Sequence, residues 1–544
     1  MTAENENRTK LEEVARASWL PMIIILLAQI QMAFNVNALP VSIGAIVDDL
    51  DVPATAIGTA LVVYSLVVAG FVMLGAKLSK LFGARLVFQV TVLIHGAAMA
   101  LMAASRSDSM MNNAQAIAGL AAAALVPTLV VLIASNYHGR QQEQSLGLLA
   151  GGAPMAGVAA FLIAGYLATA VSWRVSFAAL FILSVVVVFL SFRLNSVPRE
   201  SGVKIDIVGA VMAALAVILI SVAFNNLNNW GVLFARPGAP FDLFGLSPAL
   251  FVIALGVVLG QGFFVWSHKR QERGKTPLLS LEVLDSKYER SAIFSLFIIS
   301  SLGPAVNFLI PLYIQIVQGR TSLQTAVAVV PYTVAIFGAA VLIVRLFDKL
   351  PPRRIGMIGF IFVAFGLAML AFAIRNEWGT PLVIVSLMIL GLGEGALITL
   401  LFNILVTSSP KSLAGDVGAL RGTANNLGTA IGTATAATLS VGLLSFFVLG
   451  SLAGNQLLTV DLQAQVNLDN INFVSNDQLL ETMGSTSASQ EQVAEAVQIN
   501  VLARLRALKA SFLILAAIAL LAIIPALGLP NYVPGEVPAS PPDE

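Results

Sequence analysis

The chain has 544 residues, of which 58% are hydrophobic and only 11% charged, and its mean hydropathy is +0.88. Soluble domains usually carry about 45–50% apolar and about 25% charged residues, so this composition indicates an integral membrane protein. A formal net charge of +1 argues against nucleic acid as a partner. Cysteine is absent, which excludes disulfides and thiolate metal sites. The three histidines, His95, His138 and His268, lack metal-ligand spacing, so we expect no metal or cofactor.

Apolar runs long enough to cross a bilayer recur along the chain. A spanning helix needs about 20 residues, because each residue rises about 1.5 Å and the hydrocarbon core is about 30 Å thick. Fourteen runs begin near Trp19, Ala54, Ala84, Asn113, Gln144, Trp173, Ile205, Leu246, Ser291, Ser322, Ile355, Pro381, Gly418 and Ser511. The charged residues before the first run resemble a cytoplasmic tail rather than a cleaved signal peptide.

The basic residues predict the orientation. With the N-terminus inside, 22 of the 30 Lys and Arg residues fall on the inner side of fourteen spans. Cytoplasmic loops carry the excess of Lys and Arg, so we expect a multi-pass protein of the cell (inner) membrane with both termini cytoplasmic.

An internal repeat predicts the domain organisation. The segment Lys77–Arg85 aligns with Arg345–Arg353, and at the same offset Tyr64 meets Tyr332. Duplicated halves are common in secondary transporters, whose substrate site lies near the midplane between them. The predicted segments are a cytoplasmic tail 1–18, a six-helix bundle 19–195, two inserted helices with a cytoplasmic linker 196–290, a second six-helix bundle 291–530 containing an extracytoplasmic loop 451–500, and a cytoplasmic tail 531–544.

Three strings carry a family resemblance: VSWRVSF at 171–177, IPLYIQIVQGRTSLQTAVAVVP at 310–331 and GDVGALRGTANNLGTAIGTATAATL at 415–439. They resemble the major facilitator superfamily, and within it the fourteen-span drug/proton antiporter branch. The resemblance implies an all-α polytopic fold of two six-helix bundles plus two inserted helices. It also implies efflux of small molecules by proton antiport.

The first half departs from that branch at its charged positions. Gln31 stands where the first span usually has an acid, and Gln115 where the fourth span usually has an arginine. Lys80 replaces the Asp of the loop after the second span, although Arg85 remains. The expected proton-handling residues of this half are therefore neutral or reversed.

Other gating positions follow from the same resemblance. Gly157 and Gly165 remain in the fifth span, where Phe161-Leu162 replaces the usual Gly-Pro pair. The second copy keeps its gating aspartate. The predicted gating residues are Lys80, Arg85, Asp348, Arg353, Gly157, Gly165 and Pro304, the last because its ring can bend the ninth span.

Glu394 is the single acid predicted near the centre of a span. A charged side chain there costs roughly 2.5–3.5 kcal/mol on insertion scales, so it usually faces the bundle interior or water and marks an ion or proton path. We expect Glu394 to bind a proton or a substrate cation. The alternative is a protonated carboxyl that serves packing alone.

Amides supply the other polar groups within the spans. Gln31 and Asn35 are four residues apart and share one helix face, while Asn307 follows Pro304 by one turn. The predicted proton- or substrate-binding residues are Glu394, Gln31, Asn35, Asn307, Gln115 and Asn425. Hydrogen bonding between helices is the alternative role for the amides, and also for His95.

The segment 451–500 lacks Lys and Arg and is rich in polar residues. It is interpreted as a solvated spacer, or alternatively as an acidic lid for cationic compounds. The stretch from Ser489 to Phe512 predicts an amphipathic helix that rests on the outer surface before the last span.

The favoured function is secondary active export of a hydrophobic or amphipathic small molecule by alternating access. The protein is expected to be a monomer surrounded by membrane lipids. The alternatives are an uncoupled lipid translocator and a transporter-like receptor that moves nothing. A membrane enzyme is the least favoured class, because no nucleotide loop, metal cluster or nucleophile-base pair stands out.

Overall fold

The computed structural model describes residues 18–137, 139–195, 199, 205–346, 349–377, 381–408, 414–453, 455–458 and 471–532. Within these ranges every regular element is helical, and the strand-like pairing is confined to isolated bridges beside Leu246. Among the described residues, thirteen helices are long and apolar enough to cross a membrane. Helix α7, Gly139–Ala170, has 32 residues. Its Ala156–Ala170 part forms a shorter apolar segment. The predicted all-α polytopic fold is confirmed.

The elements follow the predicted spans closely. The first segment contains α2 Leu20–Val41, α3 Ile43–Leu50, α4 Ala54–Phe82, α5 Ala84–Ala103, α6 Asp108–Asn136, α7 and α8 Trp173–Ser191. The middle segment contains α9 Ile207–Trp230, α10 Pro248–Glu272 and the short η1 Leu281–Leu284. The last segment contains α11 Lys287–Leu312, the π-helical η2 Tyr313–Val317, α12 Ser322–Leu346, α13 Pro352–Ala373, α14 Pro381–Ser408, α15 Ala414–Leu452, α17 Asn476–Gly484, α18 Gln490–Leu521 and α19 Ile523–Ala526.

Local chemistry explains the boundaries. Gly83 adopts φ 90°, a conformation that glycine tolerates best, and separates α4 from α5. Ser107 caps α6 by accepting a hydrogen bond from the N–H of Met110. At the start of α11, Ser286 and Glu289 form a capping box.

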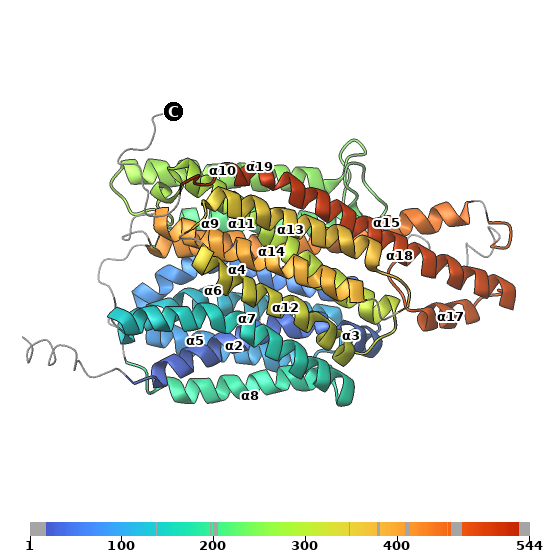
Figure 1. The fold of residues 1–544 in the computed structure, drawn as a ribbon, viewed down its shortest axis with the longest axis horizontal. Helices are drawn as coiled ribbons and strands as arrows, with labels where there is room; N and C mark the ends of the chain where they lie inside the picture. Colours follow the sequence, from blue (N-terminus) through green and yellow to red (C-terminus); the bar gives the residue numbers. More distant parts are fainter. Residues whose placement is uncertain are drawn as a thin grey trace, which may run out of the picture.

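The helices lie side by side along the long axis of the molecule (Figure 1). The end where residue 18 and residue 532 lie is called the terminal end, and the opposite end, which carries α3 and α17, is called the loop end. We call 19–195 the N-half and 291–530 the C-half. Helix α9 packs against α4 of the N-half and α15 of the C-half, and α10 packs against α9. The inserted pair thus covers the edge where α4 and α15 meet.

Small residues let the long helices approach closely. A Cβ on Gly75 of α4 would overlap the backbone of Ala123 in α6, and a Cβ on Gly432 of α15 would overlap the backbone of Ser301 in α11. Such close approach maximises van der Waals contact where no water drives association.

The last span begins earlier than predicted. Helix α18 starts at Gln490, with a Ser489–Gln492 capping box, and continues without interruption to Leu521. The predicted amphipathic helix is therefore the first part of the last span rather than a separate surface helix. Its first part packs through Ile499 on Met483 of α17 and on Leu458.

Candidate functional site

Glu394 lies in the interior of the C-half, where three helices meet. It sits near the middle of α14, its residue is only 7% exposed, and it accepts a hydrogen bond from the hydroxyl of Tyr332 in α12. A Cβ added to Gly303 of α11 would overlap the carboxylate. The glycine therefore leaves the space that the carboxyl group occupies.

Asn307 lies beside this site. It lines a narrow recess, too small to hold a water molecule, together with Val306, Ile310, Pro311, Val329, Tyr332 and Leu387. Tyr332 thus contacts the carboxylate of Glu394 and also borders the recess that Asn307 lines. Pro304, one turn before Asn307, lies within the continuous helix α11, which changes to π-helical geometry only after Leu312.

The predicted amides of the N-half form two buried pairs. The side chain of Gln31 in α2 is hydrogen-bonded to Nδ1 of His95 in α5, at 2.6 Å. Asn35 and Gln115 exchange two amide hydrogen bonds of 3.0 Å each, which join α2 to α6. All four residues are 0% exposed. In this conformation the amides bind each other and hold helices together.

The Gln31–His95 pair contains two polar atoms that form no hydrogen bond with the described residues. Oε1 of Gln31 and Nε2 of His95 are buried and have no hydrogen-bond partner among the described residues. Both atoms can take part in hydrogen bonds, and buried polar atoms are rarely left unpaired. The Asn35–Gln115 pair has no such vacancy, so the two pairs differ.

Asn425 and Arg421 lie on α15. The hydroxyl of Ser300 in α11 donates to Oδ1 of Asn425 at 3.1 Å. The guanidinium of Arg421 lies 3.9 Å from the ring centroid of Phe402 in α14, a cation–π geometry. The first contact joins α11 to α15, and the second joins α14 to α15.

The predicted gating residues occupy both ends. At the loop end, Gly165 of α7 lies against Ser322 and Ala326 of α12, and Gly157 faces Asn37. At the terminal end, Asp416 of α15 interacts electrostatically with Lys77 and Lys80 of α4. The guanidinium of Arg85 donates to the carbonyl of Phe192 at 3.0 Å. The backbone N–H of Arg353 donates to the carbonyl of Pro530 at 3.0 Å. Asp348 lies outside the described residues, as does His138.

The structure adds Gln315, which the sequence did not single out. Its amide joins the halves at the loop end: Nε2 donates to the carbonyls of Val41 and Pro40 at 3.0 and 3.3 Å, and Oε1 accepts from the N–H of Gly44 at 2.7 Å. A second bridge lies nearby, where the N–H of Leu323 donates to the hydroxyl of Thr169 at 3.0 Å. A glutamine inside the apolar string IPLYIQIVQG is the signal that could have identified the first bridge.

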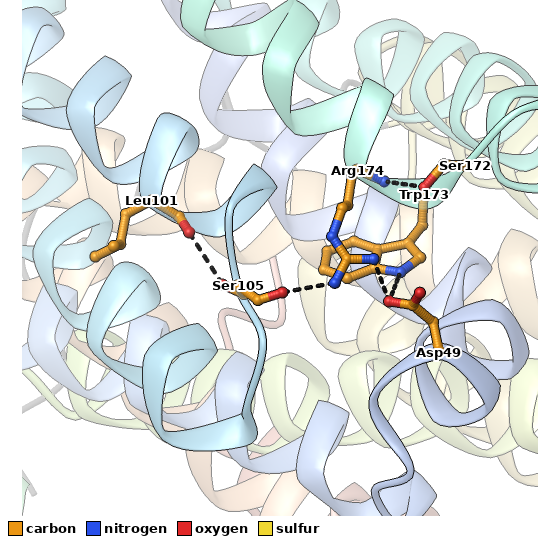
Figure 2. Close-up of polar contacts among 6 residues, drawn as sticks. All are labelled: Asp49, Leu101, Ser105, Ser172, Trp173 and Arg174. Atoms are coloured by element: carbon orange, nitrogen blue, oxygen red, sulfur yellow. Dashed lines mark hydrogen bonds and ion pairs between the residues drawn. The ribbon is translucent and has the colours of Figure 1, made fainter.

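A polar cluster fixes α3 within the N-half (Figure 2). Asp49 accepts hydrogen bonds from Nε1 of Trp173, at 3.1 Å, and from the guanidinium of Arg174, with which it also forms an ion pair. Arg174 donates as well to the carbonyl of Ser105, at 2.7 Å, and stacks over the Trp173 ring. The VSWRVSF string therefore ties α8 to α3 and to the end of α5.

Comparisons with known proteins agree with this architecture. The model of the Major Facilitator Superfamily matches residues 25–433. The puromycin resistance protein pur8 of Streptomyces alboniger is 24% identical over 438 residues, covering 78% of this chain and 82% of its own. The multidrug efflux pump LfrA of Mycolicibacterium smegmatis is 25% identical over 430 residues, covering 78% and 81%.

A solved structure has the same fold. It is that of a bacterial homologue of the human lysosomal transporter Spinster, which aligns with a TM-score of 0.59 and 14% identity over 94% of this chain and 98% of that chain. At this identity the likeness concerns the arrangement of helices.

Proposed function

The chain belongs to the Major Facilitator Superfamily, and we propose that this transporter exports hydrophobic or amphipathic small molecules in exchange for protons that bind at Glu394. The relatives are a puromycin resistance protein and a multidrug efflux pump, which supports efflux as the direction. We place it in the cell membrane as a monomer, with the terminal end facing the cytoplasm, because Lys and Arg concentrate in the loops of that end.

The observation that carries this proposal is the position of Glu394. It is a buried acid at the middle of α14, hydrogen-bonded to one side chain and close to the recess that Asn307 lines. An acidic side chain within a membrane span costs free energy, and such residues usually mark ion or proton paths. The buried amides Gln31, Asn35 and Gln115 cannot carry a proton, whereas the imidazole of His95 can, and the proposal assigns the coupling to Glu394 of the C-half.

The first prediction tests this assignment in proteoliposomes with ethidium as the substrate and a trapped pH-sensitive dye. We expect Glu394→Gln to abolish ethidium-driven proton movement and to leave ethidium counterflow intact, because the amide keeps the shape of the side chain without exchanging a proton. Proton movement at the wild-type rate in this variant contradicts the assignment.

A matched control comes from Glu481→Gln, which neutralises an exposed acid on α17. It should leave both proton movement and counterflow unchanged.

A second candidate is an uncoupled lipid translocator, favoured by the amides Gln31, Asn35 and Gln115 buried in the N-half. Its mark is movement of a fluorescent lipid that does not respond to an imposed pH gradient. If neither ethidium nor the lipid moves, the receptor alternative is favoured instead.

A further inference from the structure

The break between α2 and α3 interrupts the backbone hydrogen bonding of the helix at the loop end. Helix α2 ends at Val41, immediately after Pro40, and α3 begins at Ile43. The last carbonyls of a helix and the first N–H groups of the next have no partners within their own helices. The N–H of Ser42 turns back to the carbonyls of Ala38, Leu39 and Pro40, and the carbonyls of Pro40 and Val41 also take a partner from the other half.

Gln315 of the C-half supplies both kinds of partner. Its amide nitrogen donates to the two carbonyls at the end of α2, and its oxygen accepts from the N–H of Gly44 in the first turn of α3. The residue is only 5% exposed. A Cβ on Gly44 would lie 3.1 Å from Oε1, so the glycine gives the amide room to approach. One side chain thus caps two helices of the opposite half.

Both sides of this contact are held in place. On the N-half, the Asp49–Arg174 cluster ties α3 to α8 and α5. On the C-half, Gln315 lies in the π-helical η2, a geometry frequent at functional sites. Nη1 of Arg504 donates to the carbonyl of the adjacent Ile316 at 3.3 Å.

Arg504 also connects η2 with the segment before α18. It is 1% exposed, Nη1 donates to the carbonyl of Val474 at 2.6 Å, and Nη2 donates to Oδ1 of Asn476 at 2.6 Å. Residues 471–489, which contain α17, are called the cap. A single buried guanidinium therefore links the cap to the π-helical turn that presents Gln315.

We propose that Gln315 is the latch of the loop-end gate, and that Arg504 is a positioning residue that couples the cap to this latch. The inference deepens the proposed function, because it assigns to named hydrogen bonds the closed state of one side of the alternating-access cycle. It predicts that the closed state depends on the amide of Gln315 and not on its bulk.

The latch is weak enough to open. Each hydrogen bond contributes little net free energy, because water replaces it when the halves separate. Three such bonds change the ratio of closed to open molecules by roughly ten-fold to a thousand-fold. A contact of that strength stabilises the closed state and still lets the transport cycle open it.

Distance measurement between spin labels tests the latch. The chain has no cysteine, so labels can be placed at Val171→Cys and Glu377→Cys alone. Both positions are exposed at the loop end, one in each half. In lipid nanodiscs without substrate, we expect Gln315→Met to shift the closed-to-open ratio by at least about ten-fold toward long distances, since methionine keeps the bulk and loses the amide.

Two further variants serve as controls for the distance measurement. Gln324→Ala removes a hydrogen bond that stays within the C-half, to the N–H of Thr321, and should leave the distances unchanged. Gln315→Ala should open the gate like Gln315→Met. If Gln315→Met keeps wild-type distances, packing closes the gate and the proposal is overturned.

The measurement is independent of proton coupling. The label distances report the gate directly, whether or not ethidium drives protons. Failure of the Glu394 assignment would leave the effect of Gln315→Met in place, and failure of the latch would leave the Glu394→Gln experiment interpretable.

Discussion

At the scale of single residues, the buried amides show how a polar group becomes tolerable inside a membrane bundle. Asn35 and Gln115 satisfy each other with two hydrogen bonds and are completely buried. A buried group that loses its partner costs about 1–3 kcal/mol, whereas replacing both partners by apolar groups can be nearly neutral. The pair therefore stabilises the bundle only while both amides are present.

This asymmetry gives a prediction for the pair. We expect Asn35→Leu alone, or Gln115→Leu alone, to lower stability by about 1–3 kcal/mol in thermal unfolding of the detergent-solubilised protein. The double variant should regain most of that loss, because it leaves no amide unpaired. Additive losses in the double variant would show that the two side chains act independently.

Asp49 is a second residue whose role depends on its partners. It joins the indole of Trp173 and the guanidinium of Arg174, and the side chains of the ion pair are 42% and 29% exposed. Partial exposure reduces the contribution of the ion pair. The hydrogen bonds to a charged carboxylate remain stronger than neutral ones.

We expect Asp49→Ala to destabilise the N-half by about 1–2 kcal/mol, which is lost from the hydrogen bonds to a charged group after allowance for solvent screening. Thermal unfolding measures the loss. Asp242→Ala removes an exposed aspartate in the segment before α10 and serves as the control. An equal effect of both substitutions would rule out a specific contribution from the cluster.

At the scale of elements, α18 shows that a charged helix need not lie on the membrane surface. Its first half contains Arg504, which the structure buries against the cap. Sequence periodicity predicted an amphipathic helix there and was right about the helix. It could not show that Val474 and Asn476 bind the guanidinium of Arg504, because that contact joins residues about 30 positions apart in the chain.

The buried guanidinium predicts the behaviour of the cap. We expect Arg504→Gln to increase hydrogen exchange of the backbone amides of α17 by about ten-fold or more, because hydrogen bonds to a charged donor are lost. Mass spectrometry of the reconstituted protein measures the exchange. Arg506→Gln, which alters an exposed neighbour on the same helix, should leave α17 unchanged. Unchanged exchange in Arg504→Gln would mean that apolar packing on Met483 holds the cap.

At the scale of the whole molecule, the two ends of the interface between the halves differ in chemistry. The loop end is joined by the hydrogen bonds of Gln315 and Thr169, whereas at the terminal end the carboxyl of Asp416 lies within electrostatic range of Lys77 and Lys80. Transport by rocking halves requires each end to open in turn.

The sequence by itself determined the membrane class, the helical fold and most span boundaries, because hydropathy is local and additive along the chain. Five helices begin at the predicted residues Ala54, Ala84, Trp173, Ser322 and Pro381. It also predicted that Glu394 lies in the interior of a helix bundle, since an acid among apolar residues is visible without any partner.

Only the tertiary structure decided which polar groups meet. Gln315 bonds with Gly44, which lies 271 residues earlier in the chain, and Tyr332 reaches Glu394 from a different helix. Such pairings depend on how helices pack, and no local pattern encodes them. The sequence therefore determined where the chain crosses the membrane, and the packing decided which residues hold the halves together.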